Sequence, residues 1–455
     1  MILRLNLRFS YAKMSDMGTS KSKKIRWKKV IIIGGGASGI TAAISAARMG
    51  AEVLLIDHMD RIGKKILSTG NGKCNYTNRT QGVRFYRGED PAFVLPVFRQ
   101  FGFAETIRFF HELGIFPKER DGYFYPASGQ ASSVLDVLMM ELRRLDVDVR
   151  TGCEILSVRK KTHTFEIQTR QGTFVSDSCI FACGGMAFPK SGSDGSAFPH
   201  IEAFGHTFTS LVPALVQMKA KQSFFKSIAG IRADSLVQLY INDRIVCQDR
   251  GELQLTKEGI SGIPAFQVSR YAAKALAKKQ TVSVRLDFAP DLSVRELKRE
   301  LEERFYRGDG KTAQEALIGM ISKNLIPVFL KQSGILLHHP ADQVSKKSLA
   351  ALTGTLKQTA ADIVDVEGFD RAQACAGGVH TSELDAHTLE SRLICGLYFA
   401  GEVIDIDGMC GGYNLQWAWS SGYVAGMHAA GLPAKTTKSS SDASDHTALI
   451  RKQKG

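Results

Sequence analysis

Apolar and polar residues follow two different patterns along the chain. At both ends of the chain, short apolar runs are joined to helices of small residues. The run VIIIG starts at Val30, the small-residue segment ITAAISAARM ends at Gly50, and AEVLLID is the next apolar run. A strand, a helix and a strand in this order predict a parallel sheet. SCIFACGG, which ends at Gly185, and GLYFAGE, which starts at Gly396, predict further strands, and the helix WAWSSGYVAGMHAAG follows the second.

The middle of the chain has the second pattern. SLVQLYINDRIVCQ alternates apolar and polar residues and predicts a hairpin that turns at Asn242–Asp243. TVSVRLDF places apolar residues on alternate positions from Val282 to Phe288 and predicts a half-buried strand. A capping box from Ser293 to Glu296 predicts the start of a helical stretch, broken at Pro327. These antiparallel strands and helices differ from the strand–helix–strand pattern of both ends.

The two patterns predict an α/β nucleotide-binding domain with an insert. We expect the domain to comprise residues 30–204 and 375–432, with helices over 91–146 around the polar segment KERDGYFYPASGQ, and strands over 151–173. The insert covers residues 205–374, is rich in β-strands, and has a helical part at about 291–358. Residues 1–29 and 433–455 are predicted to be disordered tails.

Charge is concentrated in these tails. The chain has a net charge of +14; residues 1–29 contribute +8 and residues 433–455 contribute +3, so the folded part is only weakly basic. Basic tails attract polyanions such as RNA, although soluble disordered ends explain them equally well. No apolar run reaches the ~18 residues of a membrane span. Arg4 and Arg8 interrupt the first apolar segment, which excludes a secretory signal of the usual kind, and Met14 or Met17 is an alternative start.

Cysteine usage predicts a reducing compartment. Eight cysteines in 455 residues, none in a CxxC pair, do not form a disulfide framework. We therefore expect free thiols and a cytoplasmic protein. The sequence also lacks HExxH and any paired Cys/His spacing, so no metal site is predicted.

The first glycine motif predicts a dinucleotide site. Gly34, Gly36 and Gly39 form GxGxxG after a strand and before a helix, and Asp57 ends the next strand, 18 residues beyond Gly39. These glycines allow backbone N–H groups at a helix N-terminus to approach a pyrophosphate, and the acid accepts hydrogen bonds from ribose hydroxyls. A glycine turn in an ordinary α/β domain is the alternative. No second GxGxxG occurs, so NAD(P)H is expected to visit only transiently.

The second glycine motif suits a flavin. Gly401 and Glu402 end a strand, and an acid in this position can hold a ribityl hydroxyl. Gly411, Gly412 and Asn414 then place N–H donors at a helix N-terminus, where they can face the pyrimidine carbonyl of a flavin. The alternative is a second plain turn between sheet and helix. The loop STGNGKCNYTN, from Ser68 to Asn78, is too polar for a core strand and too rich in Gly and Asn for a helix.

Six motifs, in this order, resemble one known family: GGGASG, GKKILSTGNGKCNYTN, FACGG, GELQLTKEGISG, ACAGGVH and GLYFAGEVIDIDGMCGGYNLQWAWSSGYVAG. They resemble the BaiN/RdsA-like, or HI0933-type, family of FAD-dependent NAD(P)H oxidoreductases, over about residues 29–430. The resemblance implies a Rossmann-like FAD-binding domain of the two-dinucleotide-fold flavoprotein type, with a β-rich and helical insert in place of an NAD domain.

The resemblance also implies roles for residues. Gly34, Gly36, Ala37, Ser38 and Gly39 would line the FAD pyrophosphate, and Asp57, where a glutamate is frequent in the family, would bind the adenosine ribose. The residues expected along the rest of the cofactor are Lys64, Lys65, Gly72, Cys74, Asn75, Ala182, Gly184, Gly185, Gly401, Glu402, Gly411, Gly412, Asn414 and Leu415.

Members of the family are linked to reduction of activated C=C bonds, in bile-acid-type enones and in a uracil of large-subunit ribosomal RNA, and an amine oxidase has also been assigned to it. Our leading interpretation is an NAD(P)H-using reductase of a uracil in 23S RNA, which gives dihydrouridine. The alternatives are a small-molecule enone reductase or amine oxidase, and a non-catalytic flavin-bearing ribosome assembly factor. Oligomeric state stays open.

Cys74 is the candidate proton donor of this reaction. A thiol with an ordinary pKa near ~8.5 is mostly protonated at neutral pH and can give up its proton to a neighbouring carbon. Cys410 and Tyr413 are further candidates. The alternative is that Cys74 only packs against the FAD.

Overall fold

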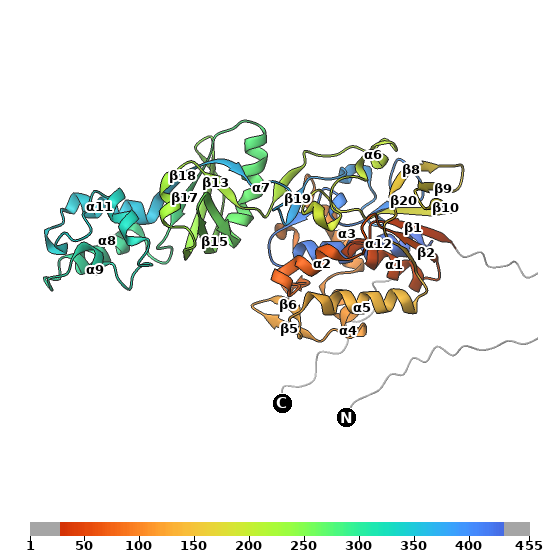
Figure 1. Ribbon diagram of the computed structural model, residues 1–455, viewed down its shortest axis with the longest axis horizontal. Coiled ribbons are helices and arrows are strands. Elements are labelled where there is room, and N and C mark those ends of the chain that lie inside the picture. The colour runs from red at the N-terminus through yellow and green to blue at the C-terminus, as the bar shows by residue number, and fades with distance from the viewer. Residues whose placement is uncertain (1–27, 432–455) are drawn as a thin grey trace, which may run out of the picture.

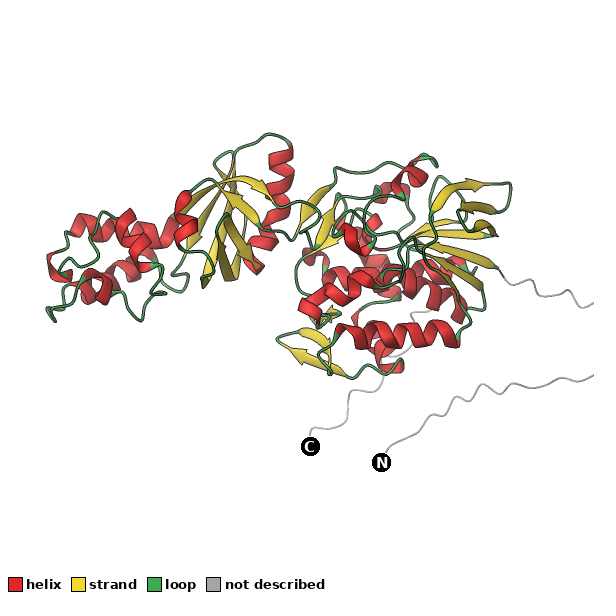
Figure 2. Cartoon of the chain, viewed as in Figure 1, coloured by secondary structure: helices red, strands yellow, loops and turns green. Residues whose placement is uncertain are grey.

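A computed structural model describes residues 28–431 of the chain. The predicted disordered tails lie almost wholly outside the described residues. The described chain has two parts that follow one another along the long axis of the molecule, a larger part built on a parallel sheet and a smaller part built on a barrel and a group of helices (Figures 1 and 2).

The parallel sheet has five strands in the order β20-β11-β1-β2-β7. Their bounds are Leu397–Phe399, Ser178–Phe181, Lys29–Ile33, Glu52–Ile56 and Asp148–Arg150. Every pair runs parallel, with Ile32 of β1 opposite Leu55 of β2 and Ile180 of β11. The order places the first predicted strand at the centre, between the second apolar run and SCIFACGG. The strand–helix–strand prediction is therefore confirmed.

Two helices of small residues cover this sheet. Helix α1 (Ala37–Arg48) follows β1, and helix α12 (Tyr413–Ala429) is the last helix of the described chain. A methyl group on Gly422 or Gly426 of α12 would overlap the carbonyl oxygen of Ser38 or Ala42 of α1, so the two backbones touch. This contact joins residues almost 400 positions apart and brings both glycine motifs to one side of the sheet.

Smaller elements surround the sheet, among them the helices α2 (Lys64–Ser68), α3 (Val94–Gln100), α4 (Phe103–Glu112), α5 (Ala131–Arg144) and α6 (Phe198–Glu202). Strands β8 (Ile155–Lys160), β9 (Phe165–Thr169) and β10 (Gly172–Ser176) form the expected hairpins over 151–173. The polar segment KERDGYFYPASGQ proves to be a hairpin of β5 (Pro117–Arg120) and β6 (Tyr123–Pro126), which pairs with β3 (Thr77–Asn78). The alternation of Tyr123, Phe124 and Tyr125 explains the strand.

The second part contains a closed barrel with the strand order β13-β16-β15-β14-β17-β18. Their bounds are Met218–Ala220, Gly259–Gly262, Arg244–Thr256, Arg232–Ile241, Val282–Asp287 and Thr359–Val366. The predicted hairpin joins β14 to β15, and both turn residues, Asn242 and Asp243, have positive φ. Helix α7 (Ile263–Ala277) packs against the barrel.

The helical group comprises α8 (Val294–Phe305), α9 (Ala313–Ala316), α10 (Ile326–Gln332) and α11 (Lys346–Gln358). Ser293 and Glu296 form the predicted capping box of α8. Pro327 lies in the first turn of α10, where a missing N–H costs nothing, so it starts a helix instead of interrupting one.

The two parts have separate hydrophobic cores. One surrounds the parallel sheet, and the other runs from Met218 to Ile363 through the barrel and the helical group. The chain passes between them along two short antiparallel strands, β12 (Val212–Ala214) and β19 (Ala374–Ala376). The second core thus lies within residues 205–374, and the exact domain limits stay a prediction. No helix among residues 28–431 is long and apolar enough to cross a membrane. All eight cysteines are free thiols.

Candidate functional site

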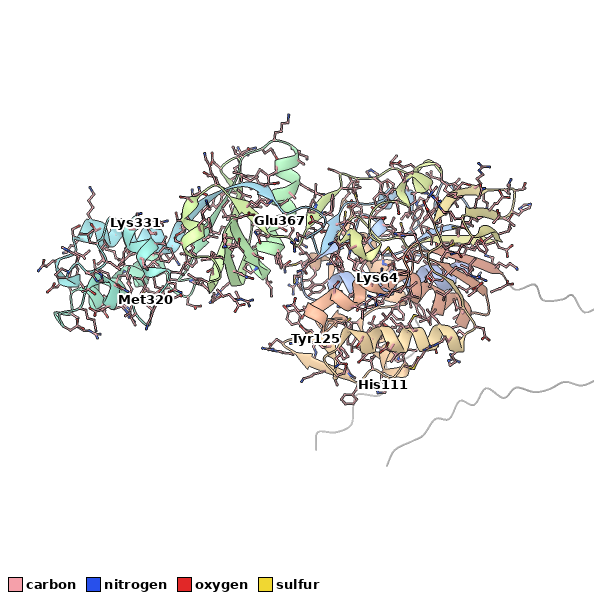
Figure 3. All side chains as sticks on the ribbon, in the orientation of Figure 1. Lys64, His111, Tyr125, Met320, Lys331 and Glu367 are labelled. Atoms are coloured by element: carbon pink, nitrogen blue, oxygen red, sulfur yellow. The ribbon has the colours of Figure 1, made fainter. Side chains whose placement is uncertain are left out.

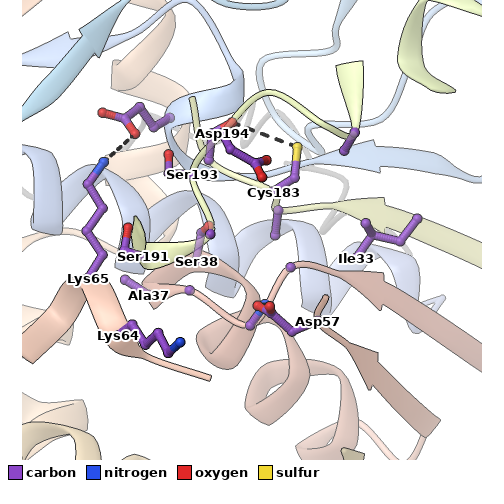
Figure 4. A pocket seen from close by; sticks show the side chains of 18 of the residues that line it. Ile33, Ala37, Ser38, Asp57, Lys64, Lys65, Cys183, Ser191, Ser193 and Asp194 are labelled. Carbon is purple, nitrogen blue, oxygen red and sulfur yellow. Dashed lines mark hydrogen bonds and ion pairs between the residues drawn. The ribbon is translucent and has the colours of Figure 1, made fainter. Parts of the chain in front are cut away.

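A cavity of about 420 Å³ opens where β1 and β2 end and α1 begins (Figure 4). Its lining comes from the first glycine motif, from Asp57 and the start of α2, from residues 182–184 and 191–197, and from Glu402 and the first turn of α12. The volume lies in the range of cofactor sites. The cavity follows the carboxyl ends of parallel strands, where α/β sheets bind their ligands.

The glycine turn at one end of the cavity leaves backbone N–H groups available. Gly34 has φ of +104°, and a Cβ there would lie 2.5 Å from the Ala182 carbonyl oxygen, so only glycine fits. Gly36 is the N-cap of α1, and no side chain caps this helix end. The free N–H groups and the positive end of the helix form a site for an anion such as a pyrophosphate.

Asp57 holds this turn in place. One of its carboxylate oxygens accepts a hydrogen bond from the Gly35 amide at 2.6 Å, and the other accepts one from the Met59 amide at 2.8 Å. The carboxylate also lines the cavity. The residue predicted to bind a ribose is therefore in place for that contact and also fixes the loop that precedes α1.

Glu402 organises the other end of the cavity. Its carboxylate pairs with the Lys65 ammonium at 2.8 Å, which the dashed line from Lys65 marks in Figure 4, and accepts hydrogen bonds from the amides of Gly185 and Cys375. Three distant segments of the chain thus meet at one carboxylate. Lys64 also lines the cavity and pairs with Asp60.

The cavity has lining residues that the sequence reading did not single out. They lie mainly in the segment 191–197, and His58 and Cys183 belong to them as well. Figure 4 shows Ser193 and Asp194 above the glycine turn. The Ser193 hydroxyl is buried in the cavity wall and has no hydrogen-bond partner. The signal in the sequence was the run PKSGSDGS, whose Gly and Ser content is typical of a loop that approaches a ligand.

These features fit FAD at the pyrophosphate and adenosine end. An uncapped helix start and a buried hydroxyl without a partner both require a polar ligand, and Asp57 suits ribose hydroxyls. Among residues 28–431, no group of three or more His, Cys, Asp and Glu lies close enough to hold a metal ion.

The predicted cofactor residues fall into two groups. Those that line the cavity are Gly34, Gly36, Ala37, Ser38, Asp57, Lys64, Lys65, Ala182, Gly184, Glu402, Asn414 and Leu415. Those that lie behind the lining, next to it in sequence or packing, are Gly39, Gly72, Cys74, Asn75, Gly185, Gly401, Gly411 and Gly412. Gly72 is exposed with open space around it, whereas other members of the second group pack behind the wall. A Cβ on Gly412, for example, would lie 2.9 Å from the Asn75 side chain, so the GKCN loop supports the start of α12.

Cys74 does not occupy the position that its predicted role requires. Its side chain is fully buried in the core around the parallel sheet, and it is not part of the cavity lining. Burial raises the pKa of the thiol to about 12, and a hydrogen bond with Thr69 offsets this only in part. A proton donor must reach the reacting carbon. In this structure Cys74 packs beneath the loop, which favours the alternative that it only packs and leaves proton donation by Cys74 an untested prediction.

The two other candidates lie closer to the cavity. Tyr413 precedes the lining residue Asn414, and its ring stacks on Phe85 with 4.6 Å between ring centroids. Burial raises its pKa to about 12. The Cys410 amide donates a hydrogen bond to the Gln267 side chain of α7 at 3.1 Å, which joins the α12 motif to the barrel part. Burial raises the Cys410 pKa to about 11.

Comparison with known proteins identifies the family. The family described as "HI0933-like protein Rossmann domain" matches residues 28–428. The chain belongs to this family. It is 46% identical over 407 residues to the 3-dehydro-bile acid delta(4,6)-reductase of Clostridium scindens, a match that covers 89% of this chain and 100% of that protein. It is 30% identical over 398 residues to the ribosomal RNA dihydrouridine synthase of Escherichia coli, covering 87% and 96%.

Comparison with solved structures gives more distant matches. The 3-ketosteroid-delta4-(5alpha)-dehydrogenase of Rhodococcus jostii aligns over 90% of this chain and 99% of its own, with 15% identity and a TM-score of 0.47. The chain is an FAD-dependent oxidoreductase with a Rossmann-type FAD-binding domain and a β-rich insert. The predicted family, fold class and enzyme class are therefore confirmed.

Proposed function

We propose that the protein reduces a C=C bond conjugated to a carbonyl group, with NAD(P)H as the reductant of its FAD. The observation that supports this proposal is that two relatives of the chain are named for reactions of this one type. A 3-dehydro-bile acid delta(4,6)-reductase acts on double bonds that conjugate with a ketone, and dihydrouridine synthesis saturates the uracil double bond next to a carbonyl. Both are additions of a hydride and a proton to an electron-poor alkene.

The cavity residues have the roles that such a reaction needs. Bound FAD would supply the hydride. The turn from Gly34 to Ser38 and the Asp57 carboxylate would hold its pyrophosphate and adenosine ribose. The Lys65–Glu402 pair and the first turn of α12 would hold the opposite end, where the positive end of the helix favours the negative charge of a reduced flavin.

The substrate we propose is a uracil in 23S ribosomal RNA. The E. coli relative is named a ribosomal RNA dihydrouridine synthase, which supports a ribosomal RNA substrate. Charge supports the choice: +11 of the net +14 lies in residues 1–29 and 433–455, of which only Lys28 and Lys29 are described residues. In the helical group, Lys323, Lys331, Lys346 and Lys347 are exposed and make no ion pair with another described residue. Cations of this kind can neutralise phosphates, and a paired base must then leave its stack to reach the cavity.

A bile-acid-type enone is the second candidate, because the C. scindens relative is the more similar of the two at 46% identity. The two candidates share one chemistry and differ in the size and charge of the molecule around the double bond. The cavity therefore does not distinguish the two candidate substrates, and an assay with each of them does.

Deletion of the gene, followed by mapping of dihydrouridine in 23S RNA, tests the leading substrate. We expect one dihydrouridine to disappear and to return when the wild-type gene is supplied. Cys74→Ala should also restore it, whereas Gly34→Val, which blocks the glycine turn, should not. An unchanged dihydrouridine map in the deletion strain excludes the RNA substrate.

Purified holoenzyme tests the enone candidate and the electron donor. Under anaerobic conditions NAD(P)H should bleach the flavin, and a 3-oxo-4-ene steroid or an RNA fragment should then restore its colour. Bleaching by an amine, with hydrogen peroxide formed in air, would instead identify an amine oxidase. Two results together would favour the assembly factor. The modification is lost in the cell only when the protein cannot bind FAD, and the purified protein turns over no substrate in vitro.

A further inference from the structure

Beyond the Asn414 end of the cavity lies a group of tyrosines that the glycine motifs do not explain. Tyr123 and Tyr125 come from β6, and Tyr413 is the first residue of α12. A Cβ on Gly411 would lie 2.9 Å from the Tyr123 ring and 3.3 Å from the Tyr413 ring. A Cβ on Gly70 would lie 3.7 Å from the Tyr125 ring. We call Tyr123, Tyr125 and Tyr413 the tyrosine cluster.

The three hydroxyls of the cluster have no hydrogen-bond partner among residues 28–431. This differs from Tyr86, which lies in the same region and bonds to the Gln81 side chain and to the Tyr413 carbonyl oxygen. Tyr123 and Tyr125 are only half-buried. Their hydroxyls are therefore available to a molecule that enters from the barrel side, toward which β6 and Tyr125 lie in Figures 1 and 3.

The barrel contributes a carboxylate to the same place. Asp249 of β15 is half-buried, and it makes no ion pair or hydrogen bond with any described residue. Loss of solvent raises its pKa to about 6, and the charge of Arg87 on β4 (Tyr86–Arg87) only partly opposes this. The charge of Asp249 in turn raises the pKa of Tyr123 and of Cys410, after the larger effect of their own burial. Asp249 thus lies on the barrel side of the junction, within electrostatic reach of Tyr123 and Cys410.

Fixed contacts hold the two parts together at this junction. Arg270 of α7 forms a buried ion pair with Asp407 at 2.8 Å, and Gln267 of α7 accepts the Cys410 amide. The barrel is therefore held by direct contacts to the segment that leads into α12. A carboxylate without a partner that is kept in such a place requires an explanation other than packing.

We propose that the substrate site lies between the tyrosine cluster and strand β15 of the barrel, with Tyr123 as the proton donor and the Asp249 carboxylate on the barrel side of the bound substrate. This inference rests on the proposed reduction of a conjugated C=C bond. Tyr123 is chosen because it makes the closest approach to the Gly411 turn, its hydroxyl has no hydrogen-bond partner among residues 28–431, and its side chain is only half-buried, whereas that of Tyr413 is buried. The aromatic rings of the cluster suit a flat conjugated substrate.

The proton and electrons balance as follows. A hydride from the reduced flavin forms a C–H bond at the carbon remote from the carbonyl, and the electron pair of the C=C bond moves onto the carbon next to the carbonyl. The Tyr123 hydroxyl delivers its proton to that carbon, and the phenolate then takes a proton from water. Burial raises the Tyr123 pKa, so the hydroxyl is protonated at neutral pH and available for this step.

Tyr123→Phe in the holoenzyme is the first test, with Tyr240→Phe as the matched control. Tyr240 lies on β14, and its hydroxyl also has no hydrogen-bond partner among the described residues, but it stacks with Arg285 far from the cluster. With 2-cyclohexen-1-one as the probe, re-oxidation of the reduced flavin should slow at least 100-fold in Tyr123→Phe and less than twofold in the control. FAD content and flavin reduction by NAD(P)H should not change.

Deuterium from heavy water gives a readout that a structural role would not alter. The wild type should place one deuterium on a single face of the carbon next to the carbonyl, and Tyr123→Phe should place it on both faces. If Tyr123→Phe keeps the wild-type rate of flavin re-oxidation and still places deuterium on a single face of the carbon, the role of Tyr123 is overturned. If the wild type reduces neither the probe nor an RNA fragment, the proposed function itself has failed.

Asp249→Asn tests the Asp249 carboxylate separately. The rate of flavin re-oxidation in the wild type should change with pH around 6, and this step in the pH profile should be absent from the variant. The groups that face Asp249 are Arg87, Cys247, Cys410 and Tyr123. Arg87→Gln should therefore shift the same step to higher pH. An identical pH profile in wild type and Asp249→Asn overturns the role of Asp249.

Discussion

Asp249 should lower the stability of the folded protein at neutral pH. Its pKa is raised by burial from 3.8 to about 6, so the folded state binds the proton more tightly than the unfolded state. The penalty is absent below about pH 4 and complete above about pH 6. The shift corresponds to about 3 kcal/mol at most, and solvent screening of this partly exposed group reduces it to about 1 kcal/mol.

Asp249→Asn is therefore expected to melt at a higher temperature than the wild type at pH 7.5. The difference should disappear at pH 4. Thermal melts of the holoenzyme at the two pH values measure it. Asp136→Asn, an exposed position on α5 without an ion pair, is the control and should show no gain at either pH. A gain that persists at pH 4 would exclude the raised pKa as its cause.

The Cys74→Ala variant is expected to keep FAD binding and catalytic activity and to lose stability. The thiol is enclosed by core residues, so its loss leaves a small cavity that costs about 1 kcal/mol. FAD content, reduction by NAD(P)H and re-oxidation by substrate should stay within twofold of the wild type. A variant that binds FAD normally but re-oxidises 100-fold more slowly would restore Cys74 as the proton donor.

The sequence predicted some site residues and missed others for one physical reason. Gly34, Gly36 and Asp57 belong to one strand–helix–strand unit, whose spacing is set by local geometry, so the motif is visible in the sequence. Ser193 reaches the cavity only through the fold, and the same holds for Tyr123 and Asp249 at the proposed substrate site. Cys74 stood in a distinctive loop, but which of its side chains face the cavity depends on backbone angles, and Cys74 has φ of +55°.

At the scale of elements, the contact between α1 and α12 determines whether the cavity can form. Gly426→Ala would place a methyl group against the Ala42 backbone and push the two helices apart. We expect this variant to lose FAD and most of its soluble yield. Gly354→Ala is the matched control, since Gly354 lies on an exposed face of α11 with open space around it. There alanine should stabilise the helix by about 0.5–1 kcal/mol. FAD absorbance and melting curves measure both.

The buried pair of Arg270 and Asp407 is the second decisive contact between elements. Desolvation raises the Asp407 pKa to about 6, and Arg270 opposes that rise. Arg270→Leu leaves the carboxylate buried without a counter-charge, which we expect to cost about 3–5 kcal/mol. The loss should be larger at pH 8 than at pH 5, because a carboxyl with a raised pKa is protonated at low pH and then carries no charge.

The double variant Arg270→Leu/Asp407→Leu provides the control for this pair. It removes both charges and should recover much of the lost stability, as apolar replacements of buried ion pairs often do. Denaturant titrations of the three variants measure the effect. Equal losses in the single and double variants would show that the contact acts through shape and not through charge.

At the scale of the whole molecule, the sequence indicated two hydrophobic patterns, and the structure has two main hydrophobic cores. The change from strand–helix–strand units to alternating strands was visible because each pattern has its own hydrophobic period. Closure of the barrel was not visible, because it depends on the pairing of β13 with β18 across almost 150 residues. The hairpin of β5 and β6 was also missed, since four-residue strands between helices are too short for a clear period.

The shape and charge of the molecule lead to a final prediction about its substrate. Lys346 and Lys347 are the first residues of α11, where the positive end of the helix makes cations unfavourable, and neither has an ion pair with a described residue. Such charges do not serve the fold. If ribosomal RNA is the substrate, they neutralise phosphates, and kcat/KM for an RNA fragment should fall steeply between 50 and 200 mM KCl.

Lys346→Glu/Lys347→Glu should then weaken RNA reduction and lower the slope of log kcat/KM against log salt by about 2. The same variant should melt at a slightly higher temperature, because acids are favourable at a helix start. Reduction of 2-cyclohexen-1-one should be independent of both salt and substitution, since it meets no phosphate-binding surface. An unchanged salt slope for RNA in the variant would show that α11 does not contact the RNA, and the basic residues 1–29 and 433–455 would then be the segments to truncate.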